Sequence, residues 1–138
     1  MQALKYRLPW PPSVNHYWRH VVINGRPRTL LSKEGRDYKL QAVDAVRGQR
    51  RGPSAPLSGR IAISVTLFPP DKRSYDLDNR IKAIQDSLTA AGVWEDDNQV
   101  KVLHLEEGEV VKGGACIVHI APAPDRIALL SAYGEEED

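Results

Sequence analysis

The residues of this sequence that are best suited to chemistry are aspartates around one short segment. Asp76 and Asp78 lie two positions apart in the run SYDLDN, and Asp96 and Asp97 follow further along the chain. In extended backbone, residues i and i+2 point to the same side, so Asp76 and Asp78 are expected to converge while Leu77 points into the core. A returning chain could bring a third carboxylate beside them, and spacing leaves open whether this is Asp96 or Asp97.

Such a group of carboxylates predicts a cation site. Two carboxylates about 5 Å apart repel each other by roughly 3 kcal/mol at an effective dielectric constant of about 20. They persist together by binding protons or cations, and hard oxygen ligands suit Mg²⁺ or Mn²⁺. Two divalent ions would balance three carboxylates and one phosphodiester, as in two-metal phosphoryl transfer. Lys82 follows Asp78 by four positions and so shares its side of the next helical turn, where it would add electrostatic stabilisation.

A structural interpretation of the same residues stays open. Asp78 is a suitable helix N-cap, and Asp76 could be an ordinary turn residue. The run from Asp96 to Asn98 could equally be a polar turn. A phosphatase-type aspartate nucleophile fits less well, because residues 72–74 separate the motif from the preceding apolar strand.

A second set of candidates is basic and aromatic and is expected to contact nucleic acid. Cationic side chains displace counterions from phosphates, and aromatic rings stack on exposed bases. The candidates are His16, Tyr17, Arg19, His20, Arg26 and Arg28, extended by Lys72 and Arg73. The alternative is that Tyr17 and Trp18 pack in the core while the basic residues are merely solvated.

The charge of the chain is distributed unevenly, although the formal net charge is only +1. Residues 1–75 contain 14 Lys and Arg against 4 Asp and Glu, a balance of +10. Residues 76–138 contain 5 against 14, a balance of −9. This asymmetry indicates contact with a polyanion, or an acidic tail.

The periodicity of apolar residues predicts strands and helices in alternation. Tyr38, Ala42 and Val46 have helical spacing after Ser32, a good N-cap, and Gly92 is a natural residue to follow the second helix. The expected elements are strands at 4–8, 61–67, 100–105 and 116–120, a hairpin around Asn24-Gly25, helices at 33–46 and 79–91, and a short helix near 125–132. This order predicts an α+β (mixed α/β) fold, with a mostly antiparallel sheet covered by two main helices.

Length and composition bound the class of protein. The 138 residues fit one domain, expected at 1–122, with a C-terminal extension at 123–138 that ends in an acidic tail. No apolar run is long enough for a transmembrane helix, and the N-terminus lacks the apolar core of a signal peptide. Cys116 is the only cysteine, so an intrachain disulfide is excluded and a buried small residue is expected. A cytoplasmic location is the expectation.

Three motifs resemble those of one known family. They are LPWPPSVNHYWRH, DLDNRIKAIQDSLTAAGVWEDDNQV and VKGGACIVHI, and the similarity around them covers roughly residues 4–121. The sequence is similar to the RusA family of Holliday-junction resolvases, which are small homodimeric endonucleases of bacteria and phages. This resemblance implies a RusA-like fold, dependence on Mg²⁺ or Mn²⁺, and symmetric cutting of four-way DNA junctions.

The resemblance also implies roles for individual residues. Asp76, Asp78 and Asp97 match the metal-binding carboxylates of the family, which selects Asp97 over Asp96. Lys82 matches the active-site lysine, and Asn15 lies in the PPS-x-N motif that supports the DNA surface. The family often has an unbroken arginine run before DLD, where this chain has DKRSY, and the segment after Pro122 has no recognised counterpart.

The expected function is therefore a metal-dependent, structure-selective DNA endonuclease for four-way junctions in recombination and repair. Two alternatives stay open. The basic half of the chain would also suit a branched-DNA-binding module without catalysis. The same site would equally serve a nuclease for flaps or replication forks.

Overall fold

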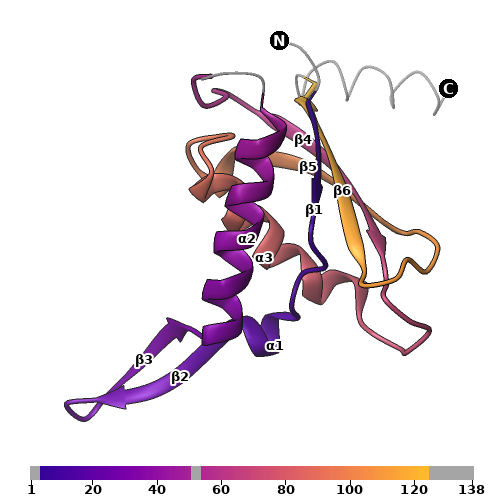
Figure 1. Cartoon of the computed structure of the whole chain (residues 1–138). Helices are drawn as coiled ribbons and strands as arrows, with labels where there is room; N and C mark the ends of the chain where they lie inside the picture. The colour runs from indigo at the N-terminus through magenta and orange to yellow at the C-terminus, as the bar shows by residue number, and fades with distance from the viewer. Residues whose placement is uncertain (1–3, 51–53, 125–138) are drawn as a thin grey trace, which may run out of the picture.

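A four-stranded sheet forms the body of the protein, with the strand order β1-β6-β4-β5 (Figure 1). The computed structural model describes residues 4–50 and 54–124. The strands are β1 (Leu4–Leu8), β4 (Ile61–Phe68), β5 (Val100–Glu107) and β6 (Ala115–Pro122). β6 pairs antiparallel with both β1 and β4, whereas β4 pairs parallel with β5. The expected α+β fold is confirmed, and the parallel pair is the feature that periodicity did not reveal.

Two helices, α2 (Lys33–Gln49) and α3 (Ile81–Ala90), pack together against this sheet (Figure 1). Alternate residues of β4 from Ile61 to Leu67 are buried, as a half-buried strand requires. Tyr38, Ala42 and Val46 of α2 join them in a single hydrophobic core, together with Ile84 and Leu88 of α3. The apolar stripes of the two helices therefore hold α3, and the segments at its ends, in a fixed position.

Local signals in the sequence account for the helix boundaries. The Ser32 hydroxyl accepts a hydrogen bond from the Gly35 amide at 2.9 Å, which is the expected N-cap of α2. Gly92 has a φ of 75° directly after α3, a left-handed conformation that glycine adopts readily. Both predicted helices are confirmed, although α2 continues to Gln49 and α3 is preceded by a separate turn of 3₁₀ helix.

A two-stranded hairpin extends away from the body (Figure 1). Its strands are β2 (Trp18–Ile23) and β3 (Arg26–Leu31), which pair antiparallel. Asn24 and Gly25 have φ values of 51° and 73°, as a two-residue turn of this kind requires. The predicted Asn-Gly hairpin is confirmed, and Pro27 lies in a strand with one free edge, where its missing N–H is tolerated.

Three short helical segments complete the described part of the chain. They are α1 (Val14–Tyr17), the 3₁₀ helix η1 (Leu77–Arg80) and the 3₁₀ helix η2 (Asp97–Gln99). The short helix predicted near 125–132 and the acidic tail lie outside the described residues. Within residues 4–50 and 54–124, no helix is long and apolar enough to cross a membrane.

Two glycines of α2 are expected to respond to alanine with opposite signs. A Cβ at Gly35 would lie 2.5 Å from the Tyr17 carbonyl oxygen, whereas a Cβ at Gly48 would meet nothing within 4 Å. Gly35→Ala should therefore lower the free energy of unfolding by roughly 1–3 kcal/mol because backbone must shift. Gly48→Ala should raise it by about 0.5–1 kcal/mol through helix propensity. Urea denaturation of both variants measures this, and a stabilising Gly35→Ala would contradict the close packing of α1 on α2.

Candidate active site

The segment between β4 and α3 carries the first two aspartates. Asp76 is extended, with φ −89° and ψ 122°, and its Oδ2 accepts a hydrogen bond from Asn79 Nδ2 at 3.2 Å. Asp78 lies inside the 3₁₀ helix η1, and both carboxylates are exposed. The argument from strand alternation is therefore wrong for this pair, because the chain coils directly after Asp76. Leu77 nevertheless packs against the core, as expected.

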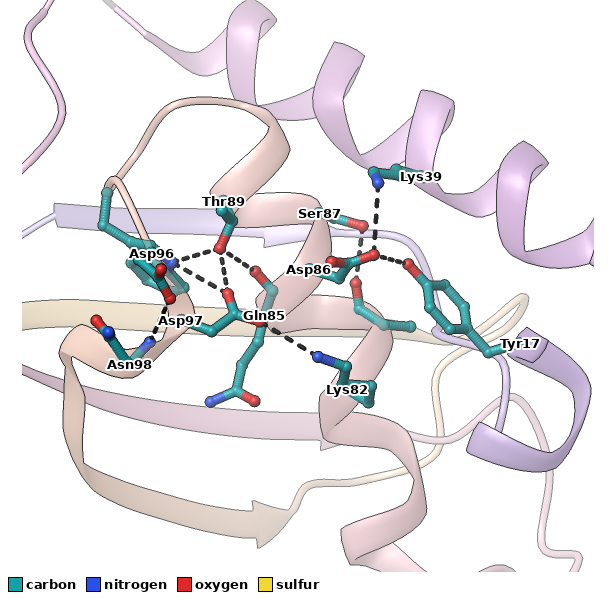
Figure 2. Close-up of polar contacts among 12 residues, drawn as sticks. Tyr17, Lys39, Lys82, Gln85, Asp86, Ser87, Thr89, Asp96, Asp97 and Asn98 are labelled. Carbon is teal, nitrogen blue, oxygen red and sulfur yellow. Dashed lines mark hydrogen bonds and ion pairs between the residues drawn. The ribbon is translucent and has the colours of Figure 1, made fainter. Parts of the chain in front are cut away.

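Asp97 is held by a set of polar contacts with α3 and the loop that follows it (Figure 2). Its Oδ2 lies 3.4 Å from Lys82 Nζ. Its Oδ1 accepts a hydrogen bond from the Thr89 hydroxyl and lies 3.4 Å from Trp94 Nε1. Trp94 Nε1 also donates to Thr89 Oγ1 at 2.6 Å, and its indole ring is buried. Both oxygens of Asp97 are therefore oriented by the protein.

Asp96, the residue before Asp97, is the N-cap of η2. The Asp96 carboxylate accepts a hydrogen bond from the Asn98 amide at 2.9 Å, and Gln99 Oε1 accepts one from the Asp96 amide at 2.9 Å. These reciprocal contacts form a capping box at the start of η2. Of the two aspartates that spacing left open, Asp97 is thus the one that faces α3, while Asp96 caps the following turn.

The three candidate metal ligands are not gathered at one point in this structure. Within residues 4–50 and 54–124, no three His, Cys, Asp or Glu side chains form a group that could hold a metal ion. The Thr89 contact fixes Asp97 near the last turn of α3, whereas Asp76 and Asp78 precede its first turn. At about 1.5 Å per residue, ten residues of helix extend about 15 Å. Lys82, in the first turn of α3, extends its side chain toward Asp97.

Tyr17 has a structural role, and its predicted place on a DNA-binding surface is wrong. Its side chain is fully buried, and its hydroxyl donates a hydrogen bond to Asp86 of α3 (Figure 2). Lys39 of α2 lies 3.5 Å from the same carboxylate. Burial, followed by the bond to Asp86, raises the pKa of Tyr17 well above its ordinary value. This network joins α1, α2 and α3, and Trp18 also packs against the core.

The remaining DNA-binding candidates are exposed and fall into three places. Arg19, His20, Arg26 and Arg28 lie on the β2–β3 hairpin, Asn15 and His16 lie on α1, and Lys72 and Arg73 lie in the loop after β4. Exposure leaves these side chains available to a polyanion, and their contact with DNA stays a prediction.

Cys116 is buried in β6, as expected. Burial raises the pKa of its thiol to about 12, so the nucleophilic thiolate is scarce at neutral pH.

Three residues near the aspartates were not singled out by sequence patterns: Thr89, Trp94 and Arg80. The WEDDNQ turn was the available signal for Trp94, whereas the contacts of Thr89 and Arg80 arise only from tertiary packing.

Carboxylates beside a lysine suit enzymes that hydrolyse phosphodiesters, because carboxylates bind hard cations and the lysine stabilises developing negative charge. Comparison with known proteins agrees with this class. Residues 9–120 match the family described as Endodeoxyribonuclease RusA. The chain belongs to this family of phosphodiester hydrolases, which confirms the predicted resemblance and the predicted enzyme class.

Individual relatives cover nearly the same region. The chain is 39% identical to the crossover junction endodeoxyribonuclease of Enterobacteria phage 82, over 83% of this chain and 90% of the relative. It is 38% identical, with the same coverage, to the crossover junction endodeoxyribonuclease RusA of Escherichia coli (strain K12). The relative from Shigella sonnei (strain Ss046) is also 38% identical. The matched region includes every aspartate discussed above.

Proposed function

We propose that this protein resolves four-way DNA junctions by paired phosphodiester hydrolysis, with divalent cations held by Asp76, Asp78 and Asp97. The observation that carries the proposal is an ion pair in a RusA-family chain: Lys82, on the helix that follows the DLDN segment, lies 3.4 Å from Asp97 of η2. A cation and oriented carboxylate oxygens are the groups that metal-assisted phosphoryl chemistry uses.

The chemistry of the donor set fits a hard divalent cation. All three side chains offer carboxylate oxygens, which suit Mg²⁺ or Mn²⁺ and not a soft metal ion. When bound, the ion would activate water and stabilise charge on the leaving oxygen. The exposed Asp76 and Asp78 have free lone pairs to offer, and Asp97 is already turned toward Lys82.

The side chains of the protein would contribute orientation and charge. Thr89 and Trp94 fix the rotamer of Asp97 through its Oδ1, which leaves Oδ2 toward Lys82. The Lys82 side chain is 43% exposed, so its ammonium group can leave Asp97 for a phosphate oxygen of bound DNA. Its charge would then stabilise the phosphodiester as negative charge develops on it.

The exposed basic hairpin and the loop after β4 would hold the DNA. Their arginines and lysines would neutralise phosphates and make the affinity dependent on salt. A homodimer would place two copies of the site on opposed strands, as paired incision requires. The two-fold axis of such a dimer would then match the symmetry of a four-way junction.

The test is a cleavage assay on a labelled four-way junction with Mg²⁺, Mn²⁺ or EDTA. We expect paired nicks with either metal and intact junction in EDTA. Without a divalent cation, the carboxylates provide no positive charge to lower the pKa of the attacking water. Cutting that persists in EDTA, or no cutting with any divalent ion, would contradict the proposal. Parallel reactions on flap and fork substrates separate a resolvase from a nuclease with broader structure preference, and tight binding without nicks would indicate a non-catalytic module.

A further inference from the structure

The guanidinium of Arg80, at the end of η1, lies against two aromatic rings that meet at a corner. Its Cζ lies 5.1 Å from the centroid of the Trp10 ring and 5.8 Å from that of Tyr75. The two rings meet edge to face, with centroids 5.2 Å apart and planes at 84°. Arg80 Nη1 also donates a hydrogen bond to the Pro11 carbonyl at 2.7 Å. The position of this cation is thus fixed from several directions.

Arg80 forms no close ion pair with a carboxylate in the described part of the chain. None of the ion pairs found among residues 4–50 and 54–124 includes it. Its Nε is buried without a hydrogen-bond partner, as is the hydroxyl of Tyr75. Burial lowers the pKa of the Arg80 guanidinium, and Glu34 and Tyr75 oppose that change. Arginine stays protonated in proteins, so the site holds a partly desolvated cation whose Nε–H has no hydrogen-bond partner.

Arg80 lines two clefts, and their charges differ. The larger, about 490 Å³, also contains the carboxylates of Glu34 and Asp37 with one lysine, which disfavours an anion. The smaller, about 230 Å³, contains Arg73 as a second guanidinium and one carboxylate, Asp71, which pairs with Arg73 at 3.7 Å. Trp10, Tyr75 and Ser74, which carries a hydroxyl group, also line the smaller cleft. A positive charge in excess and a hydroxyl donor suit a phosphate group there.

The smaller cleft is also placed next to the aspartate segment. Tyr75 in its wall directly precedes Asp76, and Arg80 ends the turn that contains Asp78. A DNA strand that passes the aspartates would therefore bring a neighbouring phosphate past this cleft. The loop has only Lys72 and Arg73 ahead of DLD, so Arg80 supplies a cation from the other side of the motif.

We propose that the cleft between Trp10 and residues 69–75 binds a DNA phosphate adjacent to the one that is cut, with Arg80 and Arg73 as its cationic contacts. Trp10 and Tyr75 hold the guanidinium of Arg80 in place. This inference rests on the proposed function, since it assigns a substrate contact to the same site.

The test is equilibrium binding of a four-way junction in EDTA, where no cleavage intervenes, at several salt concentrations. Arg80→Gln should weaken binding by about 10-fold and reduce the slope of log affinity against log salt by about one, as for loss of one phosphate contact. Arg80→Lys should fall between, because it keeps the charge and loses the planar stacking. Lys5→Gln is the matched control: it also removes one positive charge, from an exposed side chain of β1 that lines neither cleft, and should change binding by less than about 2-fold.

The outcomes separate this inference from the proposed function. Equal binding by Arg80→Gln and Lys5→Gln, with unchanged salt slopes, would overturn it, as would failure of the natural protein to bind the junction. Binding by the natural protein without cleavage in Mg²⁺ would overturn only the proposed function. If Arg80→Gln fails to fold by thermal melting, Arg73→Gln serves instead: the Arg73 side chain is 90% exposed, and its loss should also lower the salt slope.

Discussion

Replacing Asp97 by asparagine is expected to lower the rate of junction cleavage by about 10³-fold. This is the upper end of the range for loss of one group that stabilises a transition state. Asparagine keeps the shape of the side chain and an acceptor for the Thr89 hydroxyl. It removes the negative charge that would hold a cation and that pairs with Lys82. Because that pair is partly exposed, the free energy of unfolding should change by less than about 1 kcal/mol.

The matched control is Asp96→Asn in the adjacent position. Asp96 caps η2, and asparagine is an equally good N-cap, so cleavage should stay within about 3-fold of the natural protein. Single-turnover rates on a four-way junction in Mg²⁺, with urea denaturation of both variants, measure the two effects separately. Equal rates for Asp97→Asn and Asp96→Asn would contradict the assignment of Asp97 to the site.

Trp94→Ala is expected to produce the largest loss of stability, about 3–5 kcal/mol. The indole is 1% exposed and lies in the core, where truncation leaves a cavity that neighbours fill incompletely. The loss is a large part of the 5–15 kcal/mol that stabilises a typical domain. Urea denaturation measures it, with Val22→Ala as the exposed apolar control, since Val22 is 72% exposed and its loss should cost less than about 0.5 kcal/mol.

Trp94→Phe separates the packing of this side chain from its hydrogen bond. Phenylalanine retains most of the apolar ring and removes the Nε1 donor that contacts Thr89 and Asp97. Cleavage should fall by about 10-fold, with a higher Mg²⁺ concentration at half-maximal rate, as expected for loss of a group that orients a metal ligand. An unchanged Mg²⁺ dependence would leave Trp94 with a packing role alone and contradict its role in orienting Asp97.

The parts of the fold that sequence predicted are those set by local rules. The alternation of apolar residues from Ile61 to Leu67 determined β4, and Ser32 and Gly92 marked helix boundaries that the structure confirms. The parallel pairing of β4 with β5 depends on how α3 crosses the sheet, which periodicity does not contain. The four-residue helix α1 is too short to produce a periodic pattern, so the burial of Tyr17 was not predictable.

The candidate site was predictable in its residue types and only partly in its geometry. The DLDN segment and Lys82 were found from spacing, yet Asp78 lies in a 3₁₀ turn and not in extended backbone. The orientation of Asp97 depends on the Thr89 hydroxyl of α3 and the buried indole of Trp94, and tertiary packing brings both groups to Asp97. The charge asymmetry likewise predicted contact with a polyanion, but it did not reveal the Trp10 and Tyr75 rings that pack against Arg80.

Strand β6 lies inside the sheet, between β1 and β4, yet it is the last of the four strands along the chain. Leu4 pairs with Ile120, more than a hundred positions away. At the usual 5–20 residues per second, β1 leaves the ribosome roughly 5–20 s before its partner has been made. Contacts between such distant segments also slow folding. The helix pair and the β4–β5 unit can associate on the growing chain, but the four-stranded sheet closes only after β6 has been made, and until then β1 lacks its partner strand.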